Sequence, residues 1–223
     1  MKTLKITLIS ILIFTTQMMS GQVIDPFLQK LSTFKNAHPD KAKEYKDIDG
    51  SPYLFDEFID GLIYFKDTTT VKLPLRYNIF TDDMEYHVNG VNYVVSNPIT
   101  IDKVLLGESV YVYLPFIQNE GYFELFAVGK CTLIQKKLIR YKAAEGPKLI
   151  QGVAIPAVFE RKRDIFYLVF KDSQFVRVEN MKSVIDAFQD QKIKIEEFIK
   201  TEKIKRTKKD ELIKVVKYYN SLQ

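Results

Sequence analysis

Side chains able to act as nucleophiles or bases are scarce in this sequence. The 223 residues include two histidines and one cysteine. His38 belongs to a polar segment and His87 to a segment with strand-like alternation, and a nucleophile would need one of them alongside it. Ser109 lies in Gly107-Glu108-Ser109-Val110-Tyr111, which lacks the last glycine of a G-x-S-x-G elbow. We therefore predict no catalytic residue, and we expect Cys131 to be a small buried apolar side chain.

Clustered carboxylates are the other groups that could do chemistry, because paired carboxylates hydrolyse glycosides and bind calcium. The two clusters are Asp82, Asp83 and Glu85, and Asp56, Glu57 and Asp60. Neither has the spacing or the central glycine of an EF-hand, and turns favour aspartate for structural reasons. We predict no metal site, no cofactor and no enzymatic activity. The alternative is an enzyme, and the carboxylates to test first are then Asp82, Asp83, Glu85 and Glu124.

Glu124 is unusual because Phe123 and Leu125 flank it in an otherwise apolar segment. A carboxylate there is expected to face a polar cavity or to pair with Lys130 or Arg76. With the strand tyrosines it completes our set of candidate ligand-binding residues: Arg76, Tyr77, Tyr86, Tyr93, Tyr111, Tyr113 and Glu124. Tyrosine is also a preferred strand residue, so the core is the simpler place for these side chains.

Basic residues are concentrated near the C-terminus. Residues 191–217 hold ten Lys and Arg against five Asp and Glu. Such a cluster can neutralise phosphates of a nucleic acid or an anionic surface. Interspersed glutamates and the lack of aromatic residues on the polar face indicate a solvated helix face instead. We predict no nucleic-acid partner.

The first twenty-one residues have the order of a signal peptide. Lys2 and Lys5 precede an apolar stretch, Ile6–Phe14, which is followed by polar residues and Ser20-Gly21. The stretch is shorter than the ~20 residues of a spanning helix. We predict removal of residues 1–21, although cleavage after Ser20 also fits, and export to the periplasm or the medium without a membrane-spanning segment. A lone cysteine excludes an internal disulfide in that compartment.

Residues 22–49 read as a polar lead-in, with one short helix expected over Pro26–Phe34. Residues 50–180 change to short β-branched and aromatic runs separated by turn formers, which is typical of antiparallel strands. The clearest hairpin is Met84–Val95 around Asn89-Gly90, a pair that suits a type I′ turn. This turn predicts the pairs Val88 with Val91, Tyr86 with Tyr93 and Met84 with Val95, with Glu85, His87 and Asn92 on the opposite, polar face.

Further strands are expected along residues 50–180. A second hairpin is predicted around Lys171–Gln174, with Phe170 opposite Phe175. The remaining candidates are Leu62–Phe65, Val71–Asn78, Ser109–Leu114, Tyr122–Ile134, Leu138–Tyr141 and Gly152–Phe159. Pro74 and Pro156 lie inside two of these runs and predict edges, bends or bulges there.

The strands need cover on both faces. In Ser109–Leu114 two tyrosines point one way and Val110, Val112 and Leu114 the other, so neither face suits water. Residues 181–223 switch to helical periodicity, with one helix near Lys192–Lys203 and a last helix for which Thr207 is the expected N-cap. We predict an α+β fold: an antiparallel β-meander curved into a half-barrel or two-layer sheet, with C-terminal amphipathic helices packed on it.

Several segments carry a resemblance to a known group of proteins. They are Gly50-Ser51-Pro52-Tyr53-Leu54 with Asp56-Glu57-Phe58, Pro74-Leu75-Arg76-Tyr77-Asn78 with Asp83-Met84-Glu85-Tyr86, Gly121-Tyr122-Phe123-Glu124-Leu125 with Gly129-Lys130, and Tyr218-Tyr219-Asn220. In this order they resemble a family of exported Bacteroidota proteins with no assigned function. The resemblance implies export and a β-rich body with a helical tail, and it implies no reaction, ligand or catalytic residue.

Two functions fit these observations. The first is a non-catalytic periplasmic or secreted module that binds a protein partner. The alternative is a carrier or sensor of a small apolar ligand, held between the curved sheet and the helices and rimmed by tyrosines and Arg76.

Overall fold

The computed structural model describes residues 45, 47–115, 120–146, 154–172 and 174–222. The predicted signal peptide, the helix expected over Pro26–Phe34 and His38 lie outside these residues. The strands are β1 (Ile59–Phe65), β2 (Thr70–Asn78), β3 (Asp83–Val88), β4 (Val91–Val94), β5 (Ile101–Leu106), β6 (Ser109–Leu114), β7 (Gly121–Phe126), β8 (Cys131–Lys136), β9 (Ile139–Lys142), β10 (Val158–Arg161), β11 (Ile165–Phe170) and β12 (Phe175–Arg177). The helices are the 3-10 turns η1 (Pro98–Thr100) and η2 (Gln189–Gln191), and α2 (Met181–Ala187), α3 (Lys192–Thr201) and α4 (Lys209–Ser221).

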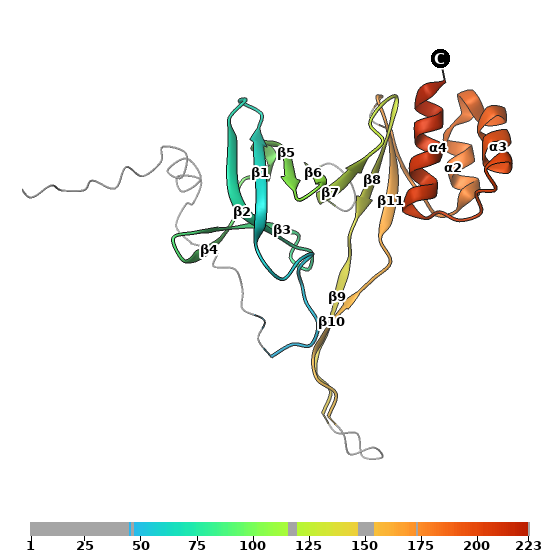
Figure 1. Ribbon diagram of the computed structural model, residues 1–223. Coiled ribbons are helices and arrows are strands. Elements are labelled where there is room, and N and C mark those ends of the chain that lie inside the picture. Colours follow the sequence, from blue (N-terminus) through green and yellow to red (C-terminus); the bar gives the residue numbers. More distant parts are fainter. Residues whose placement is uncertain (1–44, 46, 116–119, 147–153, 173, 223) are drawn as a thin grey trace, which may run out of the picture.

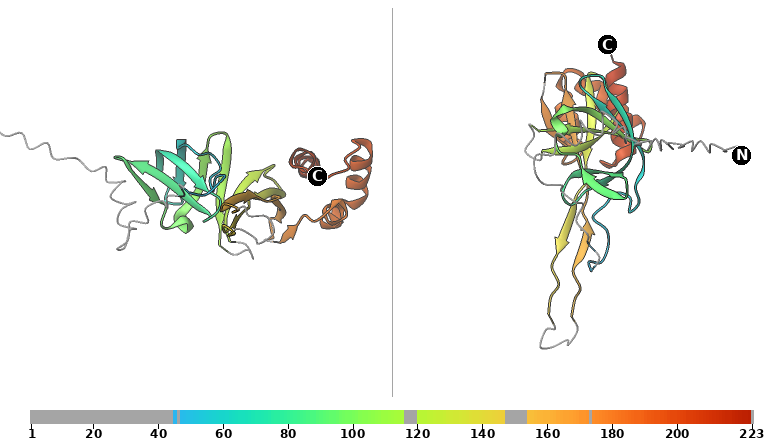
Figure 2. Two further views of the ribbon diagram at one scale, coloured as in Figure 1. Left: turned by 90° about the horizontal axis from the view of Figure 1, so that it is seen from below. Right: turned by 90° about the vertical axis from the view of Figure 1, so that its left-hand side faces the viewer.

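Ten of the described strands form one antiparallel sheet in the order β12-β11-β8-β7-β6-β5-β1-β2-β3-β4. The sheet curves strongly over β1–β6 and stays open, and the three α-helices pack against its other end (Figure 1). Strands β9 and β10 pair with each other and form an arm that projects from the body, as the right-hand view of Figure 2 shows. This arrangement confirms the predicted α+β class and the helical cover.

The β3–β4 hairpin forms as its sequence predicts. Asn89 and Gly90 have φ angles of 51° and 75°, as a type I′ turn requires. Val88 lies opposite Val91 and Tyr86 opposite Tyr93. The Val95 N–H donates to the Met84 carbonyl at 2.8 Å, which extends the predicted register to its last pair.

The β11–β12 hairpin differs from the prediction by one residue. Val169, not Phe170, lies opposite Phe175. The Phe170 N–H donates to the Gln174 carbonyl at 3.0 Å, so Gln174 belongs to the ladder and the connection is three residues long instead of four. The Asp172 carboxylate in this connection accepts a hydrogen bond from the Gln174 N–H at 3.2 Å. This local hydrogen bond closes the shorter turn.

The strands predicted from the sequence were wrong in two other places. The predicted strand Tyr122–Ile134 is two strands, β7 and β8, because the chain reverses at Ala127, whose φ is 46°. Strand β5 was not predicted because its inward-facing residues do not alternate. Ile101 pairs with Phe65 and Val104 with Ile63, so a bulge inserts an extra residue and breaks the period of two.

Pro74 lies in β2, a strand inside the sheet, but at a position where the strand has an edge. It faces Asp60 of β1, but the pairing of β2 with β3 begins only at Leu75. At Pro74 the strand therefore has a partner on one side alone, and the missing N–H leaves no gap in the ladder. Pro156 precedes β10 and is not part of a strand.

Two large apolar cores share one face of the sheet. The half-barrel core fills the curve of β1–β6 and includes Ile63, Leu75, Tyr77, Met84, Val104, Leu106 and Tyr111. The tail core joins β8 and β11 to the helices and includes Leu133, Leu168, Val184, Phe188, Leu212, Val215 and Val216. A smaller cluster around Phe123, Ile134 and Tyr167 lies on the opposite face. Both faces of the central strands are thus buried, as their composition predicts.

Candidate functional site

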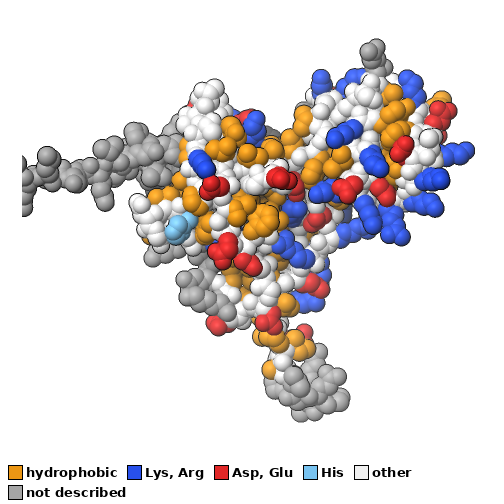
Figure 3. Space-filling model, in the orientation of Figure 1, with side chains coloured by type: hydrophobic (Ala, Val, Ile, Leu, Met, Phe, Trp, Pro, Cys, Tyr) orange, Lys and Arg blue, Asp and Glu red, His pale blue; other side chains and the backbone are white. Residues whose placement is uncertain are grey.

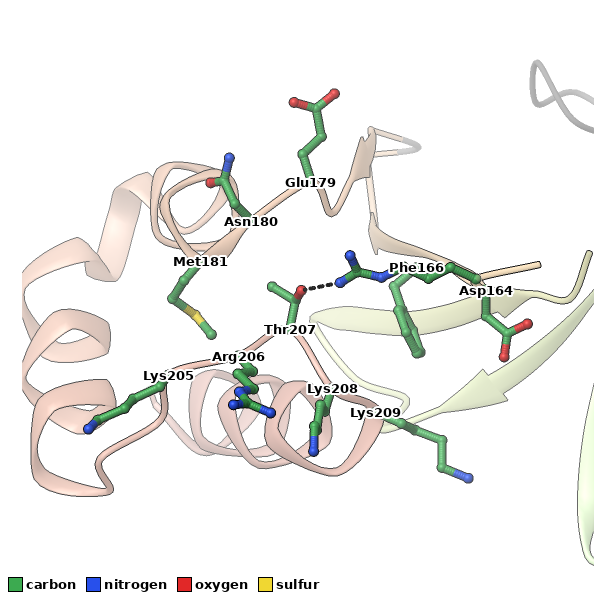
Figure 4. A pocket seen from close by; sticks show the side chains of 11 residues that line it. Asp164, Phe166, Glu179, Asn180, Met181, Lys205, Arg206, Thr207, Lys208 and Lys209 are labelled. Carbon is green, nitrogen blue, oxygen red and sulfur yellow. Dashed lines mark hydrogen bonds between the residues drawn. The ribbon is translucent and has the colours of Figure 1, made fainter. Parts of the chain in front are cut away.

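An open groove runs between the end of the sheet and the helical tail. Its larger part has a volume of about 620 Å³ and its smaller part about 450 Å³. Both parts are lined by Arg163 and Phe166 from the strand side and by Thr207 from the segment that joins α3 to α4. Figure 4 shows this joining segment passing below Met181 and Asn180 at the start of α2.

Cationic side chains make up much of the lining of the larger part of this groove. We call the whole groove the basic groove and define it by six residues: Arg163, Arg177, Lys205, Arg206, Lys208 and Lys209. None of the six forms an ion pair with another described residue. Figure 3 shows Lys and Arg side chains gathered over the helical end of the molecule. The larger part of the groove therefore carries an excess of positive charge.

The local structure of the joining segment differs from the prediction. Helix α4 begins at Lys209 with Lys208 as its N-cap, and no side chain caps it. Thr207 is therefore not the N-cap; its hydroxyl accepts a hydrogen bond from Arg163 Nη2 at 3.4 Å, across the groove. The Arg206 N–H instead donates to the Glu211 carboxylate at 2.8 Å. Glu211 lies in the first turn of α4, where its negative charge offsets the positive end of the helix dipole. The positive charge beside the groove therefore comes from the basic side chains.

Two carboxylates also line the groove, and both are in the part that its two halves share. Asp164 accepts a hydrogen bond from the amide of the buried Gln135. Glu179 extends away from the Lys205–Lys209 segment in Figure 4. The apolar lining comes from Phe166 and Met181, among others. The site thus combines unpaired cations at its ends with acceptors near its middle.

Arg76, the first of the predicted ligand residues, is part of the fold. Its Nη2 lies 2.7 Å from the carboxylate of the buried Glu85, and the Arg76 side chain itself is 12 % exposed. The guanidinium lies 3.6 Å from the centre of the Tyr53 ring and 4.2 Å from that of Phe58. Glu85 is therefore not on a solvated face, because its charge is paired inside the protein. This cluster fixes residues 53–58 to β2 and β3.

Glu124 faces a polar contact, but with a different cation from those predicted. Its carboxylate lies 2.9 Å from Lys137 Nζ and accepts the Ser109 hydroxyl at 2.6 Å. Lys130 and Arg76 are engaged elsewhere, with the Leu222 carbonyl and with Glu85 respectively. Ser109 therefore has an acidic neighbour.

The predicted tyrosines lie mostly in the half-barrel core. Tyr77 and Tyr111 are 1 % exposed and their ring centres are 5.4 Å apart, and Tyr86 stacks on Tyr93 at 5.3 Å. Burial raises the pKa of Tyr86 to about 12. Tyr113 is half-buried and lines a separate open pocket. The structure does not bring the seven predicted residues to one site.

The pocket beside Tyr113 has a volume of about 460 Å³ and lies where the half-barrel comes closest to closing. There Asp82 binds Lys136 Nζ at 2.5 Å and accepts the Tyr77 hydroxyl at 2.6 Å. Burial raises the pKa of Asp82 and lowers that of Lys136. Lys136 also donates to the Glu120 and Tyr122 carbonyls, so all its donors are used. We call these contacts the closing staple, since they join the β2–β3 loop to β7 and β8.

Sequence reasoning missed the basic groove. The run Lys205–Lys209 was visible as part of a basic segment, but Arg163 and Arg177 stand more than twenty-five residues earlier and are brought beside it only by the fold. Cys131 is fully buried, as predicted, and burial raises the pKa of its thiol to about 12. In the part of the chain that the structure describes, no group of three or more His, Cys, Asp and Glu could hold a metal ion. Among the same residues no helix is long and apolar enough to cross a membrane.

No family model, curated protein or solved structure matches this chain. The resemblance to exported Bacteroidota proteins therefore stays a prediction. Two of the segments that carry it lie side by side: the Asn220 amide donates to the Ala127 and Cys131 carbonyls and accepts the Cys131 N–H, beside Gly129. These contacts hold the end of α4 against the β7–β8 turn.

Proposed function

We propose that the protein is an exported, non-catalytic binding module whose ligand is held by an anionic group in the basic groove. The observation that carries this proposal is that six cations, none in an ion pair with another described residue, line an open groove whose two parts have volumes of about 620 Å³ and 450 Å³. Arginine and lysine donate to phosphate and carboxylate oxygens, and arginine does so with a planar fork. Export is supported by the order of the first twenty-one residues.

A binding role is preferred to catalysis because three of the four carboxylates suggested for an enzyme are each held by a lysine or arginine. Asp82 holds Lys136, Glu85 holds Arg76 and Glu124 holds Lys137. Removing one partner of such a pair leaves an uncompensated buried charge, so these carboxylates are needed by the fold. The alternative function, a carrier of an apolar ligand, would need a cavity between the sheet and the helices. That space is filled by fully buried side chains such as Val184, Phe188 and Leu212, so it gives this alternative no support.

The test is a calorimetric titration of the purified protein with inorganic pyrophosphate. We expect saturable binding that the double substitution Arg163→Gln/Arg206→Gln weakens by about tenfold or more, or about 1.4 kcal/mol. Two exposed lysines of α3, Lys194 and Lys200, lie outside the groove, so Lys194→Gln/Lys200→Gln removes the same charge and should leave the affinity within about twofold. Equal loss in both double variants would show non-specific attraction and refute the proposal.

A further inference from the structure

The pocket beside Tyr113 has the opposite charge to the basic groove, and the two share no lining residue. Three carboxylates line this pocket, those of Asp82, Asp83 and Glu120, and none of the described residues in its lining is a lysine or arginine. The closing staple pairs Asp82 with Lys136, so Asp83 and Glu120 carry the excess negative charge. An open pocket of about 460 Å³ with this charge attracts a cation.

The three carboxylates lie around one aromatic ring. Tyr113 of β6 is opposite Tyr122 of β7 in the ladder, and the centres of the two rings are 5.3 Å apart. Burial and the negative charges of Glu120, Asp82 and Asp83 raise the pKa of Tyr113. The face of a tyrosine ring attracts cations, and the carboxylates beside this ring add to the attraction.

Two residues that line the pocket, Tyr122 and Thr81, have buried hydroxyl groups without a hydrogen-bond partner in the described part of the chain. Tyr122 is 2 % exposed. Burial, Asp82 and Asp83 raise its pKa, so its hydroxyl lies near the carboxylates of the pocket. Buried polar groups are rarely left without a partner. A ligand that donates hydrogen bonds in this pocket would satisfy these hydroxyls.

The remaining wall of the pocket is apolar. Val94, Val95 and Pro98 line it between the end of β4 and the start of η1. A metal ion would gain nothing from this wall, and no group of His, Cys, Asp and Glu in the described residues could hold one. An aliphatic amine suits both sides of the pocket, because its ammonium group has three donors and its methylene groups can pack on the apolar wall.

We propose that the pocket beside Tyr113 is a binding site for a small aliphatic amine, whose ammonium group is held by Asp83, Glu120 and the Tyr122 hydroxyl. The Tyr113 ring and the apolar wall then contact the carbon chain and the charged end of the same ligand. This site goes beyond the proposed function and does not depend on the basic groove, so either site can fail its test alone.

The experiment is a calorimetric titration of the purified protein with 1,4-diaminobutane, compared with 1,4-butanediol and calcium chloride. We expect saturable binding of the diamine and about tenfold or more weaker binding of the diol, which has the same carbon chain but no charge. Asp83→Asn/Glu120→Gln should weaken the diamine about tenfold or more. Asp102→Asn/Glu108→Gln removes the same charge at exposed positions outside the pocket and should keep the affinity within about twofold.

Tyr122→Phe tests the pocket without changing its charge, and it keeps the proposal testable if the carboxylate variant does not fold. Because it removes a hydroxyl that no described residue uses, it should fold and should weaken the diamine about fivefold or more. Unchanged diamine affinity in Tyr122→Phe would overturn the proposal. So would equal loss in the two carboxylate variants, a diol that binds as tightly as the diamine, calcium as the tightest probe, or no saturable binding. Arg163→Gln/Arg206→Gln should bind the diamine as the unaltered protein does.

Discussion

Individual side chains in this protein show how buried polar groups are used to fix a curved sheet. Arg76, Lys136 and Lys137 each hold one carboxylate inside the fold, with distances of 2.5 to 2.9 Å. Removing one partner of such a pair leaves an uncompensated buried charge and costs about 3–5 kcal/mol. The cations of the basic groove have no such carboxylate partner among the described residues, which is why we propose that they bind a ligand.

Buried tyrosines give the protein a testable pH dependence. Burial raises the pKa of Tyr77 and Tyr122 well above their ordinary value of 10.0. Above pH 10 the unfolded chain ionises these phenols and the folded chain does not, so the folded state binds more protons and stability falls as pH rises. Each such phenol contributes a loss of about 1.4 kcal/mol per pH unit, and below pH 10 its contribution is fully present.

Phenylalanine substitutions separate this effect from hydrogen bonding. The Tyr122 hydroxyl is buried without a hydrogen-bond partner in the described structure, whereas that of Tyr77 donates to Asp82. Tyr122→Phe should therefore change the neutral-pH unfolding free energy by less than about 1 kcal/mol, and Tyr77→Phe should lower it by about 1–3 kcal/mol. Above pH 10, both substitutions should reduce the fall of the unfolding free energy with pH by the contribution of one phenol. Denaturant unfolding at a series of pH values measures this, and an unchanged slope in both variants would contradict the buried phenols.

At the level of strands and helices, the closing staple depends on a glycine. Gly121 has a φ of 130°, and a Cβ atom there would lie 1.4 Å from Asp82 Oδ2 and 2.4 Å from Lys136 Nζ. Gly121→Ala is expected to lower the unfolding free energy by about 3 kcal/mol or more, because the ion pair must move. Gly146 has no heavy atom within 4 Å of its Cβ position, so Gly146→Ala should cost less than about 0.5 kcal/mol. Similar urea-unfolding midpoints for Gly121→Ala and Gly146→Ala would contradict the role of the closing staple.

Much of the element structure follows from local sequence. The Asn89-Gly90 turn and its alternation specify the β3–β4 register, since both depend on residues close in the chain. The β5 bulge and the reversal at Ala127 could not be predicted, because neither has a local turn signal that outweighs the surrounding apolar residues. The prediction of Thr207 as the N-cap of the last helix was wrong for a similar reason. Its hydroxyl accepts a hydrogen bond from Arg163, which lies more than forty residues away in the sequence.

At the level of the whole molecule, the fold class was predictable and the site was not. Strands apolar on both faces require cover, and amphipathic helices at the C-terminus supply it. The basic groove arises because β11 and β12 bring Arg163 and Arg177 to the segment that joins α3 to α4. Periodicity locates helices and strands but does not say which loops meet. The seven residues chosen from the sequence were chemically plausible, yet four of them, Tyr77, Tyr86, Tyr111 and Glu124, are buried in the fold.

The central claim is that the ligand site lies in the basic groove between the sheet and the helical tail. The most direct test follows the backbone amide resonances of the labelled protein by NMR during titration with inorganic pyrophosphate. The account predicts saturable shifts centred on Arg163–Phe166, on Arg177–Asn180 and on Lys205–Lys209. Shifts centred instead on the pocket beside Tyr113 and Asp83, or spread evenly over exposed lysines such as Lys194, would contradict it.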